Sequence, residues 1–438
     1  MGARETALNV LIACRKEGGW SNGVLKEYLL RDRLDRRDAA LATRLCYGVI
    51  QNRNYLDFHL QQLLTGSMKK LHPALRDILH LGLYQIYLMD KIPEAAAVHE
   101  SVELAKHYCR KQPAAPGLVN GVLRSAVRTK DTRKEPTSWE DKYSHPGELI
   151  NLLKGYVGKE RTEPMLRANN EVPPMTVQVN TLRISARELI TRLEEEGVTA
   201  EPHSWLEGCL VLTGTGSIEQ LQAFREGLFY VQDPAARLSV LCGGLTEDTR
   251  QVLDCCAAPG GKSFAAAIAM GGKGSITSCD VYPHKAELIG KGAGRLGMAN
   301  ITPKVQDATV FCPQWEKAMD AVIADVPCSG YGIIRKKPDI RYKNLEEMKQ
   351  LPALQEKILS NAARYVKPGG VLLYSTCTLV WEENEGMVEK FLHTHPDFTT
   401  EPLPLPVPFP KNESGMLALV PGEYDTDGFF ICRLRRKL

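Results

Sequence analysis

The sequence lacks any apolar run approaching the roughly 20 residues that a membrane span needs. Its first residues, Met-Gly-Ala-Arg-Glu-Thr, also lack the basic block followed by an apolar block that marks a signal peptide. These absences exclude the common membrane and secreted classes. They predict a cytoplasmic chain that works without a membrane, and we expect it to be a monomer.

Cysteine clusters are also missing. The chain has 12 cysteines, but no C-x-x-C pair and no His/Cys group at zinc spacing. We therefore predict no metal site and no disulfide, including between the adjacent Cys255 and Cys256, because neighbouring cysteines form strained bridges. Most of the twelve are expected to be reduced, small core residues.

Charge of one sign is not in large excess, since the net charge is +3. Its distribution is uneven, however: residues 1–130 hold 20 Lys and Arg against 12 Asp and Glu, whereas the remainder holds 35 against 40. A basic first third is typical of contact with a phosphate backbone. Solvated helix surfaces would have a similar composition, so the charge leaves both interpretations open.

Residues 1–130 show apolar residues at helical spacing, for example Leu75-Ile78-Leu79 and Ala7-Leu8-Val10-Leu11, and no alternating strand pattern. They predict a small helical domain. Residues 131–145 are polar and contain Pro136, which is typical of a linker. Residues 146–235 contain short strand patterns such as Met175–Asn180 beside a helix from Ala186 to Glu196, and predict a small α+β subdomain.

Residues 236–438 alternate short apolar strands with helices, which predicts an α/β domain built on a doubly wound, mostly parallel sheet. Several strands end in an acid, as in Val252-Leu253-Asp254 and Ala321-Val-Ile-Ala-Asp325. Ligands of such sheets bind beyond the carboxyl ends of the strands, and the unusual residues of this chain fall there.

The segment Leu253-Asp-Cys-Cys-Ala-Ala-Pro-Gly-Gly-Lys-Ser263 ends one strand and opens a helix. Its small residues allow a ligand to approach the backbone, and the helix start offers free N–H groups. It is not a P-loop, because Cys256 stands where that motif requires glycine. The string Gly292-Ala-Gly-Arg-Leu-Gly297 lies within a helical stretch, so it does not predict a dinucleotide site.

Acids after the next two strands favour a nucleoside ligand. Asp280 ends the second strand, where a carboxylate can accept both ribose hydroxyls. Asp307 follows the third, where a carboxylate can accept from an exocyclic amine. Each acid alone could equally cap a turn. With Asp254 at the end of the first strand, these acids stand at three successive strand ends and predict a nucleoside pocket.

Two cysteines follow strands at the same predicted edge, in Asp325-Val-Pro-Cys328-Ser-Gly and Tyr374-Ser-Thr-Cys377-Thr. Two thiols with an acid suit methylation of pyrimidine carbon 5, a poor nucleophile. A thiolate first adds to carbon 6 while an acid at ring nitrogen 3 takes up the developing charge. Carbon 5 then attacks a methyl donor, a base removes its proton, and the thiol leaves.

These motifs, with Gly332-Ile-Ile-Arg-Lys-Lys-Pro-Asp339, resemble the NOL1/NOP2/Sun RNA 5-methylcytosine methyltransferases. The runs Val98–Lys106 and Gly117–Arg124, with Arg4-x-x-Ala7-Leu8, resemble NusB-like RNA-binding domains. Together they resemble the bacterial RsmB/Sun type, which modifies 16S ribosomal RNA. The resemblance implies a Rossmann-like class I methyltransferase domain at 236–438, S-adenosyl-L-methionine as cofactor and small-subunit ribosomal RNA as partner.

The resemblance also implies residue roles. Cys377 would be the nucleophile, Cys328 would assist proton loss and product release, and Asp325 would hold the base, supported by Lys262. Arg335 and Asp339 would shape the active-site loop, and Gln232 and Asp233 would reach the pocket. The cofactor would be lined by Cys256, Ala257, Ala258, Pro259, Gly260, Gly261, Lys262, Asp280, Asp307 and Asp325.

Three alternative functions make different demands on the sequence. A non-catalytic RNA-binding adapter would need neither Cys328 nor Cys377. The same chemistry on transfer RNA stays open, because only the resemblance to NusB favours ribosomal RNA. A nicotinamide oxidoreductase fails, because no dinucleotide fingerprint follows the first strand of the α/β domain.

Overall fold

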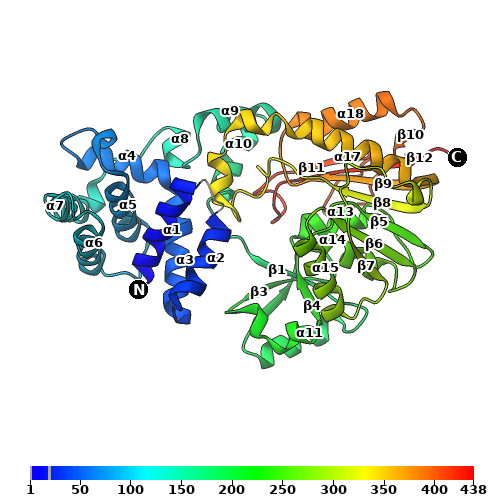
Figure 1. Ribbon diagram of the computed structural model, residues 1–438, viewed down its shortest axis with the longest axis horizontal. Helices are drawn as coiled ribbons and strands as arrows, with labels where there is room; N and C mark the ends of the chain where they lie inside the picture. The colour runs from blue at the N-terminus through cyan, green and yellow to red at the C-terminus, as the bar shows by residue number, and fades with distance from the viewer. Residues whose placement is uncertain (1, 18–20) are drawn as a thin grey trace. The chain divides into compact units, whose positions relative to one another are not determined.

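The computed structural model describes residues 2–17 and 21–438. The chain forms two compact units, whose elements are labelled in Figure 1. The helical unit comprises Met1–Lys154, Lys159–Asn170 and Ile334–Lys343, and the sheet unit comprises Gly155–Gly158, Glu171–Ile333 and Asn344–Leu438. No helix among the described residues is long and apolar enough to cross a membrane.

The helical unit is a bundle around one apolar core, as the helical spacing predicts. Its central helix α5 is buried on nearly every side, since Ile78, Leu79 and Leu81 are all inaccessible to solvent. An isolated helix this apolar would not stay in water, and its neighbours provide the cover. Its elements are α1 (Ala3–Glu17), α2 (Ser21–Asp32), α3 (Arg36–Gln51), α4 (Arg53–Leu63), η1 (Met68–Lys70), α5 (Pro73–Leu88), α6 (Glu94–Tyr108), α7 (Ala115–Arg128), η2 (Lys130–Thr132), α8 (Trp139–Lys142), most of α9 (Gly147–Val157), α10 (Lys159–Ala168) and η5 (Pro338–Tyr342).

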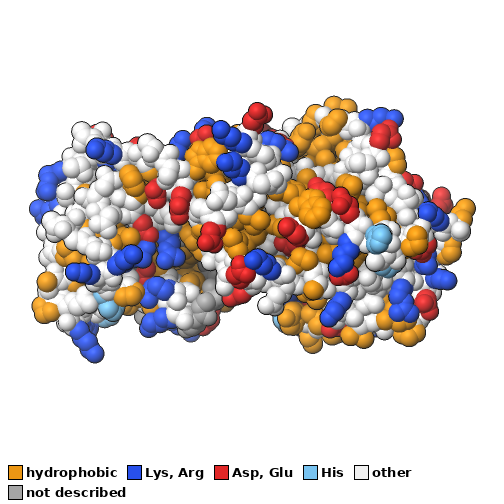
Figure 2. Space-filling view, turned by 90° about the horizontal axis from the view of Figure 1, so that it is seen from above, with side chains coloured by type: hydrophobic (Ala, Val, Ile, Leu, Met, Phe, Trp, Pro, Cys, Tyr) orange, Lys and Arg blue, Asp and Glu red, His pale blue; other side chains and the backbone are white. Residues whose placement is uncertain are grey.

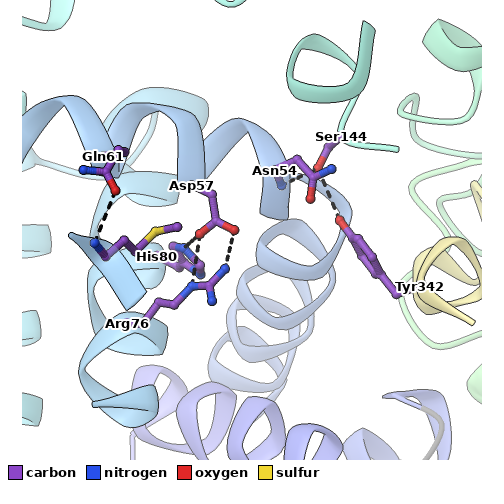
Figure 3. A network of polar contacts seen from close by, with 8 residues as sticks. Asn54, Asp57, Gln61, Arg76, His80, Ser144 and Tyr342 are labelled. Carbon is purple, nitrogen blue, oxygen red and sulfur yellow. Dashed lines mark hydrogen bonds and ion pairs between the residues drawn. The ribbon is translucent and has the colours of Figure 1, made fainter. Parts of the chain in front are cut away.

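Polar contacts join α4 to α5 (Figure 3). The carboxylate of Asp57 on α4 pairs with the guanidinium of Arg76 and lies 2.7 Å from Nε2 of His80, both on α5. Burial alone would raise the pKa of Asp57, but the hydrogen bond and charge of His80 and the pairing with Arg76 outweigh it, so the pKa lies below its ordinary value. Asp57 is therefore held as a carboxylate between the two helices.

Residues 131–145, whose composition predicts a linker, pack against the bundle in the structure. The guanidinium of Arg133 lies over the ring of Tyr87 at 4.8 Å and pairs with Glu135 at 2.9 Å. Glu135 in turn accepts from the hydroxyl of Tyr55 at 3.0 Å. Arg133 and Glu135 therefore pair with each other and with tyrosines of the bundle, which composition alone does not reveal.

Arg341 anchors the returning segment Ile334–Lys343 inside the helical unit. Its side chain is 1% exposed, and its guanidinium donates to the backbone carbonyls of Gln51 at 2.8 Å and Ser144 at 3.0 Å and to Oδ1 of Asn170 at 2.9 Å. Burial lowers the pKa of Arg341 to about 10. Neighbouring Tyr342 contacts the hydroxyl of Ser144 (Figure 3).

The sheet unit begins with a small antiparallel sheet in the order β2-β3-β1-β4, which confirms the predicted α+β subdomain. Helix α11 packs on it through Leu189 and Leu193, and begins with a capping box formed by Ser185 and Glu188. The elements are β1 (Met175–Val179), α11 (Ala186–Glu195), β2 (Thr199–Pro202), β3 (Cys209–Thr213), η3 (Ile218–Gln220), α12 (Gln222–Arg225) and β4 (Phe229–Val231).

The large sheet follows the order β10-β12-β9-β8-β5-β6-β7, with β11 paired to β12. Strands β5 to β9 are parallel to one another, whereas β12 pairs antiparallel with β9, β10 and β11, so the sheet is mostly parallel, as predicted. The strands are β5 (Gln251–Asp254), β6 (Ser275–Asp280), β7 (Ile301–Val305), β8 (Met319–Asp325), β9 (Val366–Thr376), β10 (Phe398–Thr400), β11 (Met416–Leu419) and β12 (Phe429–Arg436).

Helices cover both faces of this sheet (Figure 1). One face packs against α17 and α18 through Leu359 and Phe391, and the other packs against α13, α14 and α15 through Val240, Phe264 and Ile289. The helical elements are α13 (Pro234–Leu241), α14 (Gly261–Ala269), α15 (Pro283–Leu296), η4 (Pro313–Trp315), α16 (Leu345–Met348), α17 (Leu351–Tyr365), η6 (Trp381–Glu383) and α18 (Glu385–Thr394).

Strand order reverses beside β5, because β6 and β7 lie on one side of it and β8 and β9 on the other. Such a reversal opens a crevice at the carboxyl ends of the central strands, where ligands of doubly wound sheets bind. The string Gly292–Gly297 lies in α15 and at its end, so it does not follow a strand, as expected. The Rossmann-like fold is confirmed.

Candidate active site

The two motif cysteines meet beyond the ends of neighbouring strands. Strands β8 and β9 are parallel, with Asp325 paired in register to Ser375. Cys328 and Cys377 therefore follow at the same edge of the sheet, where their Sγ atoms lie 3.2 Å apart and share a hydrogen bond. Both side chains are partly exposed. Among the described residues no disulfide joins any of the twelve cysteines.

Cys328 and Cys377 have different charged neighbours. The pKa of Cys328 lies well above its ordinary value because of its hydrogen bond to Cys377, its burial, and the negative charges of Cys377, Glu383 and Asp325. Lys262 stands near the other sulfur, and the charge of Cys377 is among the causes that raise the pKa of that lysine. Negative charge is therefore favoured on Cys377 and disfavoured on Cys328.

Asp325, the last residue of β8, is held through both oxygens. Its Oδ2 pairs with Nζ of Lys262 at 2.7 Å, and its Oδ1 accepts from the hydroxyl of Ser375 at 2.8 Å. Burial would lower the pKa of Lys262, but the charge and hydrogen bond of Asp325 outweigh it and raise the pKa. The carboxylate thus has a fixed orientation beside the cysteine pair.

The loop between β5 and α14 contains the small residues predicted to line a cofactor. Gly260 has φ of 115°, which an L side chain rarely adopts, and an added methyl group would overlap the ring of Phe264. Backbone N–H groups of Cys255 and Ala257 donate to Ile323 and Cys279, at 2.9 and 2.8 Å. The loop is therefore hydrogen-bonded to the adjacent strands, and at Gly260 no side chain stands between its backbone and a ligand.

A buried acid supports this loop from below. Asp254 is fully buried and its Oδ2 accepts from the hydroxyl of Ser263 at 2.7 Å, which itself lies 2.7 Å from the hydroxyl of Ser278. Burial raises the pKa of Asp254 to about 7. The sequence marks Asp254 only as a strand end, and the two serines carry no signal of their own.

Asp280 ends β6 and Asp307 follows β7, at the same edge of the sheet. Asp280 is largely buried, and its Oδ1 accepts from the backbone N–H of Tyr282 at 3.1 Å. Asp307 is exposed, and its Oδ1 accepts from both the backbone and the hydroxyl of Thr309. Both acids cap turns, as the alternative interpretation expects. Oδ2 of Asp280 makes no hydrogen bond to any described residue, so it can accept from a ligand.

Other residues named from the resemblance lie as follows. Gln232 lies beside the loop, since its Nε2 would be 3.0 Å from a methyl group added at Gly261. Asp233 caps α13 through the N–H of Ala235 at 2.9 Å. Arg335 and Asp339 belong to the segment Ile334–Lys343 of the helical unit. Among the described residues no group of three His, Cys, Asp or Glu could hold a metal.

Three family profiles match successive parts of the chain. The NusB family matches residues 1–128, the ferredoxin-like domain of RsmF/B-like methyltransferases matches residues 145–219, and the 16S rRNA methyltransferase RsmB/F family matches residues 245–435.

Similar proteins span the whole chain. A probable ribosomal RNA small subunit methyltransferase B of Bacillus subtilis is 36% identical and covers 99% of this chain and 98% of its own length. A ribosomal RNA small subunit methyltransferase B of Citrobacter koseri is 32% identical, with 93% of each chain covered. The crystal structure of PH0851 superposes with a TM-score of 0.79 at 27% identity, with 98% of both chains covered. A methyltransferase homolog protein of Pyrococcus horikoshii has a TM-score of 0.58 at 27% identity, covering 68% of this chain and 98% of its own.

Proposed function

The chain belongs to the RsmB/F family of 16S ribosomal RNA methyltransferases, and on that premise we propose that it methylates carbon 5 of a cytosine in small-subunit ribosomal RNA through a covalent bond to Cys377. The observation that carries this proposal is the cysteine pair, with sulfurs 3.2 Å apart beside the Asp325–Lys262 ion pair. An RNA-binding adapter would require neither thiol nor this ion pair.

Cys377 is the nucleophile in this proposal. Its sulfur faces the positive charge of Lys262, which favours the thiolate that must add to carbon 6. Asp325 holds the ring nitrogen 3 edge, where charge develops during the addition, and Ser375 and Lys262 fix its orientation. Cys328 then assists removal of the proton from carbon 5, and the bond to Cys377 breaks to release the product.

S-adenosyl-L-methionine is the proposed cofactor, and it supplies an electrophilic methyl group. The bare backbone at Gly260, the start of α14 and the accepting Oδ2 of Asp280 fit a nucleoside with a charged tail. Residues Cys256 to Lys262, Asp280, Asp307 and Asp325 would hold it. Burial, with the charges of nearby Asp254 and Asp325, keeps the pKa of Cys256 well above its ordinary value, so this thiol lines the pocket in its neutral form.

Residues 1–130 are the proposed RNA-binding domain. They are followed by a linker at 131–145, the small α+β subdomain at 146–235 and the methyltransferase domain at 236–438. Basic side chains are more prominent than acidic ones over the helical unit, at the left of Figure 2. Reversing the exposed charges of Arg110 and Lys111 to Glu should weaken binding to ribosomal RNA and leave cofactor affinity unchanged. Equal loss of both affinities would count against this domain as the RNA-binding part.

The direct test uses labelled cofactor and small-subunit ribosomal RNA, with bisulfite sequencing of the product. The native enzyme should place the label on carbon 5 of one cytosine, and the Cys377→Ala variant should transfer none. Cys312→Ala, a change at a partly exposed cysteine outside the two motifs, is the matched control and should retain activity. Label on another base, or transfer only to transfer RNA, would overturn the proposed substrate.

A further inference from the structure

A buried acid lies beneath Cys328 and has no part in the chemistry described so far. Glu383 ends η6, in the connection from β9 to α18, and its side chain is only 2% exposed. Its Oε2 accepts two hydrogen bonds, from the backbone N–H of Ser329 at 3.0 Å and from Nε2 of Gln355 on α17 at 2.8 Å. A carboxyl group this far from solvent is rare in proteins unless it is paired or hydrogen-bonded.

The same amide reaches the other side of Cys328. Nε2 of Gln355 also donates to the backbone carbonyl of Pro327 at 2.9 Å. The residues immediately before and after Cys328 are therefore both held, one by Gln355 and the other by Glu383. The backbone that carries the Cys328 sulfur cannot shift without breaking buried hydrogen bonds.

A second contact joins the two cysteine loops. The hydroxyl of Ser329, which follows Cys328, lies 2.6 Å from the hydroxyl of Thr378, which follows Cys377. Both hydroxyls are fully buried. The Glu383–Gln355 pair thus holds the backbone on both sides of Cys328. Through Ser329, which contacts Thr378, it also helps to fix the distance between Cys328 and Cys377.

The charges around the two sulfurs differ in sign. Cys328 faces the negative groups Cys377, Glu383 and Asp325, and these charges, together with the hydrogen bond to Cys377 and burial, raise its pKa. Cys377 faces Cys328 and the cation of Lys262. Tyr374 and Tyr331 also lie near Glu383, and their own pKa values are raised by burial first, so both are neutral at physiological pH.

We propose that Glu383, with Gln355, is a positioning residue that assigns the two cysteines their roles by fixing the Cys328 backbone and keeping the shared proton on Cys328. This inference rests on the proposed function, in which Cys377 attacks and Cys328 acts later. Glu383 itself touches neither substrate nor cofactor. It acts through Cys328.

The assignment also accounts for the later step. When the Cys377 thiolate bonds to carbon 6, its charge and its hydrogen bond to Cys328 are lost, so Cys328 can release its proton to water. The resulting thiolate accepts the proton of carbon 5. The electron pair of that C–H bond restores the ring double bond as the carbon 6–sulfur bond breaks, and Cys377 leaves as a thiolate.

The test measures the pH dependence of alkylation of each cysteine by iodoacetamide, read by mass spectrometry on the full chain without RNA. In the native protein Cys377 should be alkylated faster than Cys328 at pH 7. Glu383→Gln keeps an acceptor for both hydrogen bonds but removes the charge, and should lower the pH midpoint of Cys328 by about one unit. Glu383→Asp should retain the native midpoint, and Glu382→Gln, a change at the exposed neighbouring acid, is the matched control.

Two results would overturn the inference: faster alkylation of Cys328 than of Cys377 in the native protein, or an unchanged Cys328 midpoint in Glu383→Gln. The first comparison needs no variant, so it stands even if Glu383→Gln fails to fold. Methyl transfer is measured separately, and Glu383→Gln should lower kcat several-fold with little change in KM. Because alkylation requires neither RNA nor cofactor, a failure of the proposed reaction would be seen in the transfer assay alone.

Discussion

The backbone conformation and close packing of Gly260 predict that a side chain at this position weakens cofactor binding. Replacing Gly260 by Ala places a side chain on a residue with φ of 115°, at a cost of about 1–2 kcal/mol. The new methyl group also overlaps Cζ of Phe264 and lies 2.9 Å from its Cε1. That ring is buried against Tyr230, with ring centroids 5.5 Å apart, so it cannot move aside without disturbing the core. Overpacking of this kind adds about 1–3 kcal/mol.

If the loop relieves this strain by leaving its binding conformation, cofactor affinity falls by the same free energy. A loss of 2 kcal/mol, the lower end of the combined range, corresponds to about 30-fold weaker binding. Isothermal titration with S-adenosyl-L-methionine, together with thermal melting, measures the loss and separates it from global unfolding.

Two further glycines on α15 separate the causes. A methyl group at Gly292 would lie 2.6 Å from Cζ of the same Phe264, but the backbone there is helical, so Gly292→Ala tests ring overlap alone. Gly294 is exposed with nothing within 4 Å of an added methyl group, so Gly294→Ala is the control and should stabilise slightly. If Gly260→Ala kept the native cofactor affinity and melting temperature, the loop would tolerate a side chain at this position, contrary to the prediction.

Three other predictions concern stability. Arg341→Met removes short hydrogen bonds from the oxygens of Gln51, Ser144 and Asn170 and should lower the unfolding free energy of the helical unit by about 3 kcal/mol or more, measured by urea denaturation. A loss below about 1 kcal/mol would contradict the anchoring role. Burial, with the charge of Arg341, holds the pKa of His145 well below 6.5. Neutral His145 therefore contributes fully to the unfolding free energy above pH 6.5, and this contribution falls by up to about 1.4 kcal/mol per pH unit below that value. In His145→Gln, the unfolding free energy measured in urea should depend less on pH between pH 7 and 5. Burial raises the pKa of Asp254 to about 7. Its contribution to the unfolding free energy is therefore full below about pH 4 and declines as the pH rises toward 7. Asp254→Asn should raise the melting temperature at pH 8 more than at pH 4.

The sequence predicted the sheet and its functional edge because both depend on local patterns. Apolar strands ending in Asp254, Asp280 and Asp325 identify parallel strand ends, and such ends converge in space whatever the connecting segments do. The glycines and small residues after Asp254 predict close approach of the backbone to a ligand. Short strands such as β2 and β10 were not predicted, since four or three residues carry too little periodicity.

Burial of single charged residues could not be predicted. Glu383 lies within the run Glu382-Glu383-Asn384-Glu385, in which nothing distinguishes the second acid from its exposed neighbour. Arg341 belongs to a basic segment typical of a surface loop, yet it is buried by carbonyl groups from residues nearly 200 or more positions earlier. Such partners are set by tertiary packing, which leaves no local signal. The packing of residues 131–145 against the bundle could not be predicted either, because it too depends on partners that lie far away in the sequence.

In the proposed reaction Cys377 forms the covalent bond to the base, and Cys328 is needed to break that bond. The most direct measurement is a denaturing gel of the Cys328→Ala variant incubated with small-subunit ribosomal RNA and S-adenosyl-L-methionine. We expect a slowly migrating protein–RNA adduct for Cys328→Ala, and none for Cys377→Ala or for the variant with both changes. An adduct that persists in Cys377→Ala would contradict this prediction, because Cys328 would then be the attacking sulfur.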